Sequence, residues 1–342
     1  MGIENEFQND FEERKTRLQN TSGYLTYFKD KYGLIYYSNG IVGVDPKSTR
    51  AVLVYQPSQT DEARWQPETG MFYRKNIDNG GLDVISDGVI EGELNEVIKS
   101  RRVRNPETHD AYLSVPLADI TDVYDPFTSH HSIIGARKAP IGAEYILECV
   151  ENFTSILRAY GVAKDDIGLY GGLQAGIFPT DATRFHDVDI LIRGIEYLPT
   201  VKVLAADMKK PLQLAMQGDN PIVSAMRKRM SLLQFKLDNL TVDLKVVRKE
   251  SDLNSFPAND HVDGYVGEGE QRGFILDDRE AVTSPTSFMV GLEDGREIAV
   301  TTLMYNYIGA AWSGDKVRFR GLQTPNATML TDPQKHFILA DA

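Results

Sequence analysis

The spacing of hydrophobic and polar positions changes along the chain, and each change predicts a different kind of element. In the first third, short runs rich in Val, Ile and Tyr alternate with glycine turns, which predicts strands at 33–37, 40–44, 51–55 and 113–117. The polar residues 1–20 predict a frayed helix or a mobile tail. From Ile141 to Leu157 the apolar residues recur at helical spacing, and Gly161 is a suitable end for that helix.

The second half of the chain predicts two further groups of strands. Apolar runs at 167–170, 187–193 and 242–247 predict one sheet, with a helix over 221–237 before its last strand. Residues 249–273 predict a loop, in which Gly267-Glu268-Gly269 is only a weak phosphate-binding signal. Strands are predicted again from residue 274, with a hairpin about 293–295 and a last strand at 337–339, which fits a small barrel or barrel-like sheet.

Together these segments predict an α+β protein of several domains. A chain of 342 residues, 42% hydrophobic and 25% charged, is long enough to bury more than one core. The single cysteine, Cys149, excludes an intramolecular disulfide and is predicted to be a packed core thiol. The expected order is a polar tail at 1–21, a β-rich domain at 22–137, a central domain of mixed sheet and helices at 138–255, and a small β-domain at 256–342.

The richest chemistry falls within the central domain. Asp187 and Asp189 lie in the apolar run of one predicted strand, so both carboxylates face the same side. The preceding turn, Gly171-Gly172, leaves backbone N–H groups open to a polyphosphate. Asp243 is bracketed by aliphatic residues in a later strand in the same way. A phosphate-binding turn facing paired carboxylates predicts metal-assisted nucleotidyl transfer.

The order of these elements resembles that of the DNA polymerase beta-like nucleotidyltransferase superfamily. Its signature is a Gly-Gly or Gly-Ser turn, a short helix, Asp-x-Asp on a strand and a third carboxylate on a later strand. Stretches at 160–168, 275–285 and 314–321 extend the likeness to a largely archaeal group of nucleotidyltransferase proteins with β-rich domains on either side of the catalytic one. The resemblance implies a nucleotidyltransferase domain at 138–255. Many superfamily members have serine where this chain has Gly172.

The same resemblance implies how the site is occupied. Mg²⁺ or Mn²⁺ is expected at Asp187, Asp189 and Asp243, with Asp243 on the metal that activates the acceptor hydroxyl. The alternative for Asp243 is a structural ion pair with Lys245 or Arg248. A nucleoside triphosphate such as ATP is the expected donor.

Two further candidates flank the aspartates. His186 precedes Asp187 and is a candidate contact to phosphate or acceptor, with an ordinary polar surface residue as the alternative. The basic cluster Arg227-Lys228-Arg229 lies in the predicted helix 221–237 and is a candidate for binding the triphosphate or a short RNA, with a solvated helix face as the alternative.

Composition narrows the function. A net charge of −12 argues against coating long duplex nucleic acid, and the lack of an apolar run of about 18 residues predicts a cytoplasmic protein without membrane contact. We expect transfer of a nucleoside monophosphate to a hydroxyl of RNA, protein or a small molecule, with release of pyrophosphate. The alternative is a nucleotide- or RNA-binding module with weakened or no catalysis, and a phosphohydrolase is a minor third. The base, the acceptor and the oligomeric state are not indicated.

Overall fold

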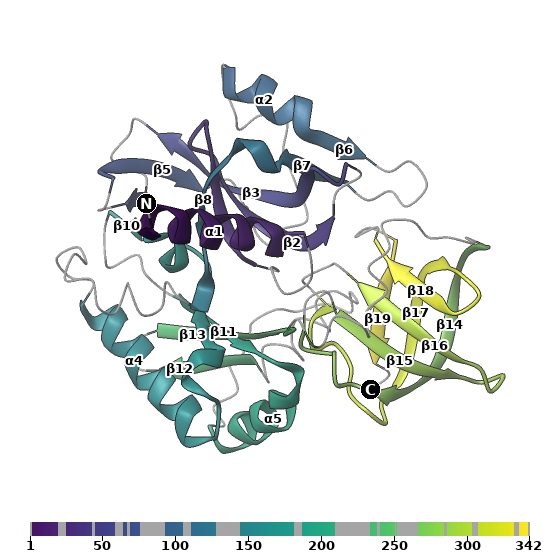
Figure 1. Cartoon of the computed structure of the whole chain (residues 1–342). Helices are drawn as coiled ribbons and strands as arrows, with labels where there is room; N and C mark the ends of the chain where they lie inside the picture. Colours follow the sequence, from purple (N-terminus) through teal and green to yellow (C-terminus); the bar gives the residue numbers. More distant parts are fainter. Residues whose placement is uncertain are drawn as a thin grey trace.

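The computed structural model describes residues 2–19, 25–42, 45–58, 64–66, 69–75, 93–104, 111–127, 144–180, 187–208, 233–237, 240–249, 251, 266–283, 286–302, 307–331 and 335–340. Within these ranges the protein is a mixed α+β structure whose strands form three sheets (Figure 1). The predicted α+β class is confirmed at this level. No helix in the described part of the chain has both the length and the apolar character needed to span a membrane.

The first sheet has nine strands and takes most of them from the N-terminal third of the chain. Strands follow the order β10-β4-β5-β3-β2-β1-β8, and β7 pairs with β3 and with β6. Helices α1 (Gly2–Arg17) and α2 (Glu93–Arg101) accompany it (Figure 1). The strands are β1 (Tyr27–Asp30), β2 (Ile35–Val42), β3 (Ser48–Ser58), β4 (Arg64–Gln66), β5 (Met71–Lys75), β6 (Arg102–Arg104), β7 (Ala111–Pro116), β8 (Ile120–Tyr124) and β10 (Phe178–Pro179).

The end of helix α1 packs against the N-terminal core. Leu18, just after α1, is fully buried in the cluster that contains Phe28 and Tyr36, and Phe11 packs against the same cluster. Arg17 also contacts Asp125 at 3.4 Å. The structure therefore has the helical form of the prediction for residues 1–20, and Phe11 and Leu18 pack in the N-terminal core.

The second sheet carries the predicted chemistry and has the order β12-β13-β11-β9. Its strands are β9 (Ile167–Leu169), β11 (Asp187–Arg193), β12 (Gln234–Leu237) and β13 (Leu240–Val247), with β11 and β13 parallel. Helices α4 (Glu144–Ala159) and α5 (Leu198–Asp207) contribute to one core with the apolar side of this sheet. Gly161, at φ +95°, ends α4, because the N–H of Val162 donates to the Leu157 carbonyl at 3.1 Å.

One predicted helix is wrong where the structure describes it. Residues 234–237, at the end of the expected helix 221–237, form β12, which pairs antiparallel with β13. Phe235 is buried on this strand and its ring lies 5.3 Å from that of Phe153 in α4. Pairing with β13 and packing against α4 outweigh the helical spacing of the local sequence. The rest of the expected helix lies outside the described residues.

The third sheet is a small barrel. Strands β14, β15, β16, β18 and β17 follow one another and close, because β17 pairs back on β14, while β19 adds to β17. The predicted hairpin is confirmed, with the Leu292 N–H donating to the Arg296 carbonyl at 2.8 Å. The strands are β14 (Gly267–Asp277), β15 (Thr286–Leu292), β16 (Glu297–Thr302), β17 (Lys316–Gln323), β18 (Ala327–Leu330) and β19 (Phe337–Ala340).

The predicted loop at 249–273 is wrong from residue 267 onward. Gly267, Glu268 and Gly269 begin β14, where they pair with residues 321–323 of β17. Their polar and glycine-rich sequence is typical of a loop, but these residues form a strand because they pair with a strand about fifty residues further along the chain. The Gly-x-Gly therefore belongs to the barrel wall and is not a phosphate-binding loop.

Candidate active site

The three predicted aspartates share one face of the second sheet. β11 and β13 run parallel, and their register makes Asp189 the direct neighbour of Asp243. Neighbouring strands lie about 4.8 Å apart, and alternation along β11 puts Asp187 on the same side. Val188 and Ile190, which alternate with the aspartates, pack into the core with α4. The carboxylates therefore occupy the face turned away from that helix.

The Gly171-Gly172 turn lies against this face. β9 pairs antiparallel with β11, and just beyond it the Tyr170 N–H donates to the Asp189 carbonyl at 3.1 Å. Gly171 has φ +76°, and a Cβ there would approach within 3.3 Å of the Asp189 Cγ and still closer to its Oδ2. Only glycine fits between this turn and the carboxylate. The structure thus brings the predicted turn next to the predicted pair.

The surroundings of Gly172 leave little room for a side chain, such as the serine that many members of the resembled superfamily have at this position. A Cβ at this position would lie 2.9 Å from the Ile177 carbonyl oxygen and 2.9 Å from the Tyr55 hydroxyl. Real Cβ atoms do not approach their neighbours so closely, so a serine here would force Tyr55 or the backbone to move. After the turn, residues 173–175 form one turn of 3-10 helix, which is the short helix that the motif predicts.

Tyr170 was not predicted as a site residue, and Lys245 was predicted only as a possible surface partner of Asp243. The Tyr170 hydroxyl donates to Oδ2 of Asp243 at 2.9 Å. Lys245 is buried, and its Nζ lies 4.0 Å from the centroid of the Tyr170 ring. Lys245 comes two residues after Asp243, so alternation places it on the same face, and Tyr170 directly precedes the glycine turn. The sequence could have indicated both residues, because Tyr170 and Lys245 lie beside the glycine turn and Asp243.

The alternative roles for Asp243 are answered in part by this packing. Lys245 does not lie at the surface, where the prediction placed its pairing with Asp243. Arg248 is fully buried and forms an ion pair with Glu280 at 2.7 Å, beside the barrel. Asp243 accepts a hydrogen bond from the Tyr170 hydroxyl, and a structural pair between Asp243 and Lys245 on the same face stays a prediction.

The surroundings of Asp189 raise its proton affinity. Burial first, and then the charges of Asp187 and Asp243, raise the pKa of Asp189 to about 7 against the opposing effect of Lys245. Among the described residues, no group of three or more His, Cys, Asp or Glu side chains is arranged so that it could hold a metal ion. The donor chemistry nevertheless fits Mg²⁺ or Mn²⁺, which take carboxylate oxygens and complete their shells with water and substrate phosphates.

The N-terminal sheet covers part of the carboxylate face. Leu25 lies in one apolar cluster with Phe127, Tyr170 and Leu191, which follows the aspartates on β11. Burial, together with the charges of Asp189 and Asp187, raises the pKa of the Tyr55 hydroxyl to about 12 against the lowering effect of Arg64. The site is thus formed between two sheets, although its motif lies in one.

The remaining predicted residues cannot be placed. His186 lies outside the described residues, as do Arg227, Lys228 and Arg229. Their predicted contacts stay predictions. The pair Asp187 and Asp189, the Gly171-Gly172 turn and Asp243 are the predicted residues that the structure brings together.

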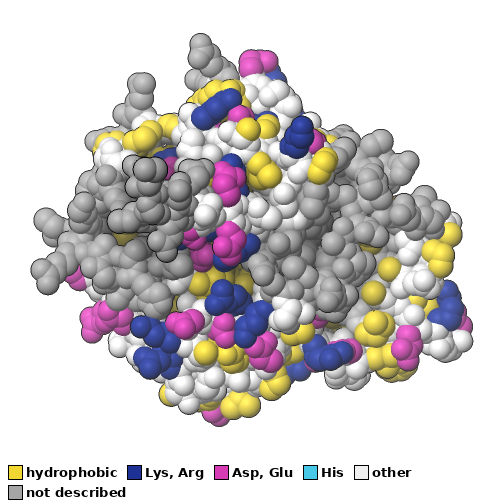
Figure 2. Space-filling view, in the orientation of Figure 1, with side chains coloured by type: hydrophobic (Ala, Val, Ile, Leu, Met, Phe, Trp, Pro, Cys, Tyr) yellow, Lys and Arg dark blue, Asp and Glu magenta, His cyan; other side chains and the backbone are white. Residues whose placement is uncertain are grey.

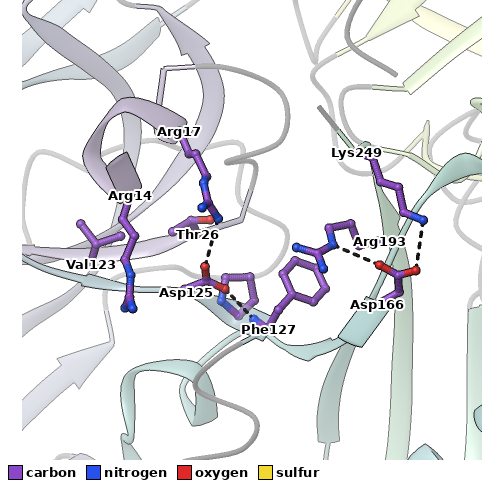
Figure 3. Close-up of a pocket in the computed structure, with 10 residues that line it drawn as sticks. Arg14, Arg17, Thr26, Val123, Asp125, Phe127, Asp166, Arg193 and Lys249 are labelled. Carbon is purple, nitrogen blue, oxygen red and sulfur yellow. Dashed lines mark hydrogen bonds and ion pairs between the residues drawn. The ribbon is translucent and has the colours of Figure 1, made fainter. Parts of the chain in front are cut away.

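A basic cavity of about 310 Å³ opens at the other end of β11 (Figure 3). Arg14 and Arg17 reach it from α1, and Arg193 reaches it from β11. The Asp166 carboxylate forms ion pairs with two cations that line this cavity, Arg193 at 3.2 Å and Lys249 at 3.0 Å. Because each of these cations is held by a carboxylate, the cavity is a region of paired charges separate from the aspartates.

Comparisons of the chain with protein-family models, with curated proteins and with solved structures each found no match. The functional assignment therefore depends on the residues of the carboxylate face. That face combines three aspartates, a glycine turn, Tyr170 and Lys245.

Proposed function

We propose that the protein is a metal-dependent nucleotidyltransferase, which moves a nucleoside monophosphate from a nucleoside triphosphate to an acceptor hydroxyl and releases pyrophosphate. The observation that carries this proposal is the register of β11 and β13, which makes Asp189 and Asp243 neighbours on the face that Asp187 shares. The glycine turn beside Asp189 supplies backbone donors at the same place.

Each residue has a distinct part in this proposal. The N–H groups of the Gly171-Gly172 turn bind the phosphates, and the absence of side chains lets the triphosphate approach the backbone. Asp187 and Asp189 would hold a metal at the triphosphate, and Asp243 would hold a metal at the acceptor. Tyr170 fixes the Asp243 carboxylate through its hydroxyl. A bound Mg²⁺ or Mn²⁺ supplies charge neutralisation and lowers the pKa of the acceptor hydroxyl.

The alternative is a nucleotide- or RNA-binding module without catalysis. Electrostatics favours an active site, because the charge of Asp189 is costly to the metal-free fold and its pKa is raised to about 7. A module that binds without metal gains nothing from three carboxylates that repel one another.

The acceptor is RNA, a protein side chain or a small molecule. Figure 2 shows Lys and Arg side chains interspersed with Asp and Glu over the described residues on the side of the molecule seen in Figure 1. Such mixed charge favours a short or small acceptor over a long duplex.

Triphosphate binding is expected to require divalent metal and to stabilise the fold. At about 100 times its dissociation constant a ligand adds about 2.7 kcal/mol to the free energy of unfolding, which raises the melting temperature by a few degrees at this size. Melting should be measured with each of the four triphosphates, with Mg²⁺ or with EDTA. The double variant Asp187→Asn, Asp189→Asn is the matched control and should show no metal-dependent shift. A melting temperature that stays the same with every triphosphate, in Mg²⁺ and in Mn²⁺, would contradict the proposal.

A further inference from the structure

Two side chains of the N-terminal sheet reach the glycine turn of the second sheet. A Cβ at Gly172 would lie 2.9 Å from the Tyr55 hydroxyl and 3.7 Å from Nη1 of Arg64. The Arg64 guanidinium lies 6.0 Å from the centroid of the Tyr55 ring. A hydroxyl and a guanidinium therefore stand where a side chain on the turn would otherwise project.

Strand pairing fixes Arg64 relative to the turn. β10 follows the turn along the chain and pairs antiparallel with β4, where Pro179 is the partner of Arg64. Gln66, on the same strand, donates from Nε2 to the Ala175 carbonyl at 2.7 Å and is buried. The turn, its 3-10 helix and β4 are thus held together by a strand pair and a buried hydrogen bond.

Arg64 forms no ion pair with another residue of the described part of the chain. No aspartate or glutamate in the described ranges lies within ion-pair distance of Arg64, and its side chain is partly exposed. The nearby carboxylates, Asp187 and Asp189, are close enough to influence Tyr55. A guanidinium recognises phosphate through two parallel N–H donors, and backbone N–H groups at the turn lie beside it. This donor set matches a polyphosphate better than a base or a sugar.

We propose that Arg64 binds the phosphates of the nucleoside triphosphate, and that Tyr55 positions Arg64 and presents its hydroxyl at the turn where Gly172 has no side chain. The inference rests on the proposed function, because it identifies which groups of the N-terminal sheet complete the nucleotide site. In this inference the β4–β10 pair has a functional role, because it holds Arg64 of the first sheet beside the glycine turn of the second sheet.

The test compares nucleotides that differ only in their phosphates. Calorimetric affinities for the mono- and triphosphate of one nucleoside, in Mg²⁺, should be measured for the wild type, Arg64→Gln, Arg64→Lys and Tyr55→Phe. We expect Arg64→Gln to weaken triphosphate binding by about tenfold or more and monophosphate binding far less. Arg64→Lys should recover part of the loss, and Tyr55→Phe should lower the triphosphate to monophosphate affinity ratio by a smaller factor.

Arg74 provides a matched control. Arg64 pairs with Tyr73 of β5, so the next residue, Arg74, points to the other side of the same sheet and is exposed. Arg74→Gln should bind both nucleotides as the wild type does. If the wild type binds triphosphate and Arg64→Gln binds it equally well, the inference is overturned while the proposed function stands. Equal losses for both nucleotides, with a lower melting temperature, would assign Arg64 a structural role and also overturn it. A wild type that binds no triphosphate overturns both.

Discussion

Asp189→Asn is expected to abolish nucleotidyl transfer and, at the same time, to stabilise the metal-free protein. Asparagine keeps the shape of the side chain beside Gly171 but removes the negative charge that a divalent cation needs. Loss of a metal ligand should slow transfer by about a thousandfold or more, which corresponds to about 4 kcal/mol of transition-state stabilisation. The measurement is turnover with Mg²⁺, made beside chemical unfolding of the same samples in EDTA.

The gain in stability follows from the raised pKa of Asp189. Burial and the neighbouring carboxylates raise this pKa to about 7, whereas the unfolded chain titrates near its ordinary value of about 3.9. Between these values the folded state binds more protons than the unfolded state, so the stability that Asp189 contributes falls as pH rises from about 4 to about 7. Asp189→Asn removes this cost, which is up to a few kcal/mol at pH 8 and small near pH 4.

An exposed aspartate of the barrel serves as the control. Asp294 lies in the β15–β16 turn, is exposed and pairs with Arg296. Asp294→Asn should leave turnover and its metal dependence unchanged. Wild-type turnover in Asp189→Asn would remove this residue from the site. A variant that is less stable than the wild type in EDTA at pH 8 would show that the carboxylate has a structural partner.

Asp243→Asn is expected to separate binding from chemistry. Asp243 is assigned to the metal at the acceptor, while the triphosphate depends on the glycine turn and on Asp187 and Asp189. The asparagine oxygen can still accept the hydrogen bond of the Tyr170 hydroxyl, so the fold should persist. We expect triphosphate affinity to stay within a few-fold of the wild type and turnover to fall by about a hundredfold or more.

The companion variant is Tyr170→Phe, which removes only the hydroxyl that donates to Asp243. It should lower turnover by a smaller factor and leave the triphosphate affinity unchanged. Calorimetric affinity and single-turnover rates decide between the outcomes. Normal turnover in Asp243→Asn would leave Asp243 as a structural residue and the proposed site with two carboxylates.

The local part of the site was predictable from the sequence because it depends on alternation and turn chemistry. Asp187 and Asp189 had to share a face once their apolar neighbours indicated a strand, and the bracketing of Asp243 by aliphatic residues indicated a second one. The register that pairs Asp189 with Asp243 could not be predicted, since several alignments of two apolar strands satisfy the same pattern.

The non-local part of the site was not predictable. Tyr55 and Arg64 lie more than a hundred residues before the glycine turn. The β4–β10 pair, which brings Arg64 to the turn, is too short to produce a recognisable periodicity in the sequence of either strand. The same limit explains the two errors of secondary structure. Residues 234–237 and 267–273 became strands through partners elsewhere in the chain, against a helical spacing in one case and a loop-like composition in the other.

One measurement tests the central claim most directly. The wild type and the triple variant Asp187→Asn, Asp189→Asn, Asp243→Asn should each be incubated with the four triphosphates labelled at the α-phosphate, with cell RNA and protein, in Mg²⁺ or Mn²⁺. The account predicts that the wild type transfers label from at least one triphosphate to an acceptor and releases an equal amount of pyrophosphate, and that the triple variant does neither. Equal transfer by both proteins, or none by the wild type with any base and either metal, would contradict it.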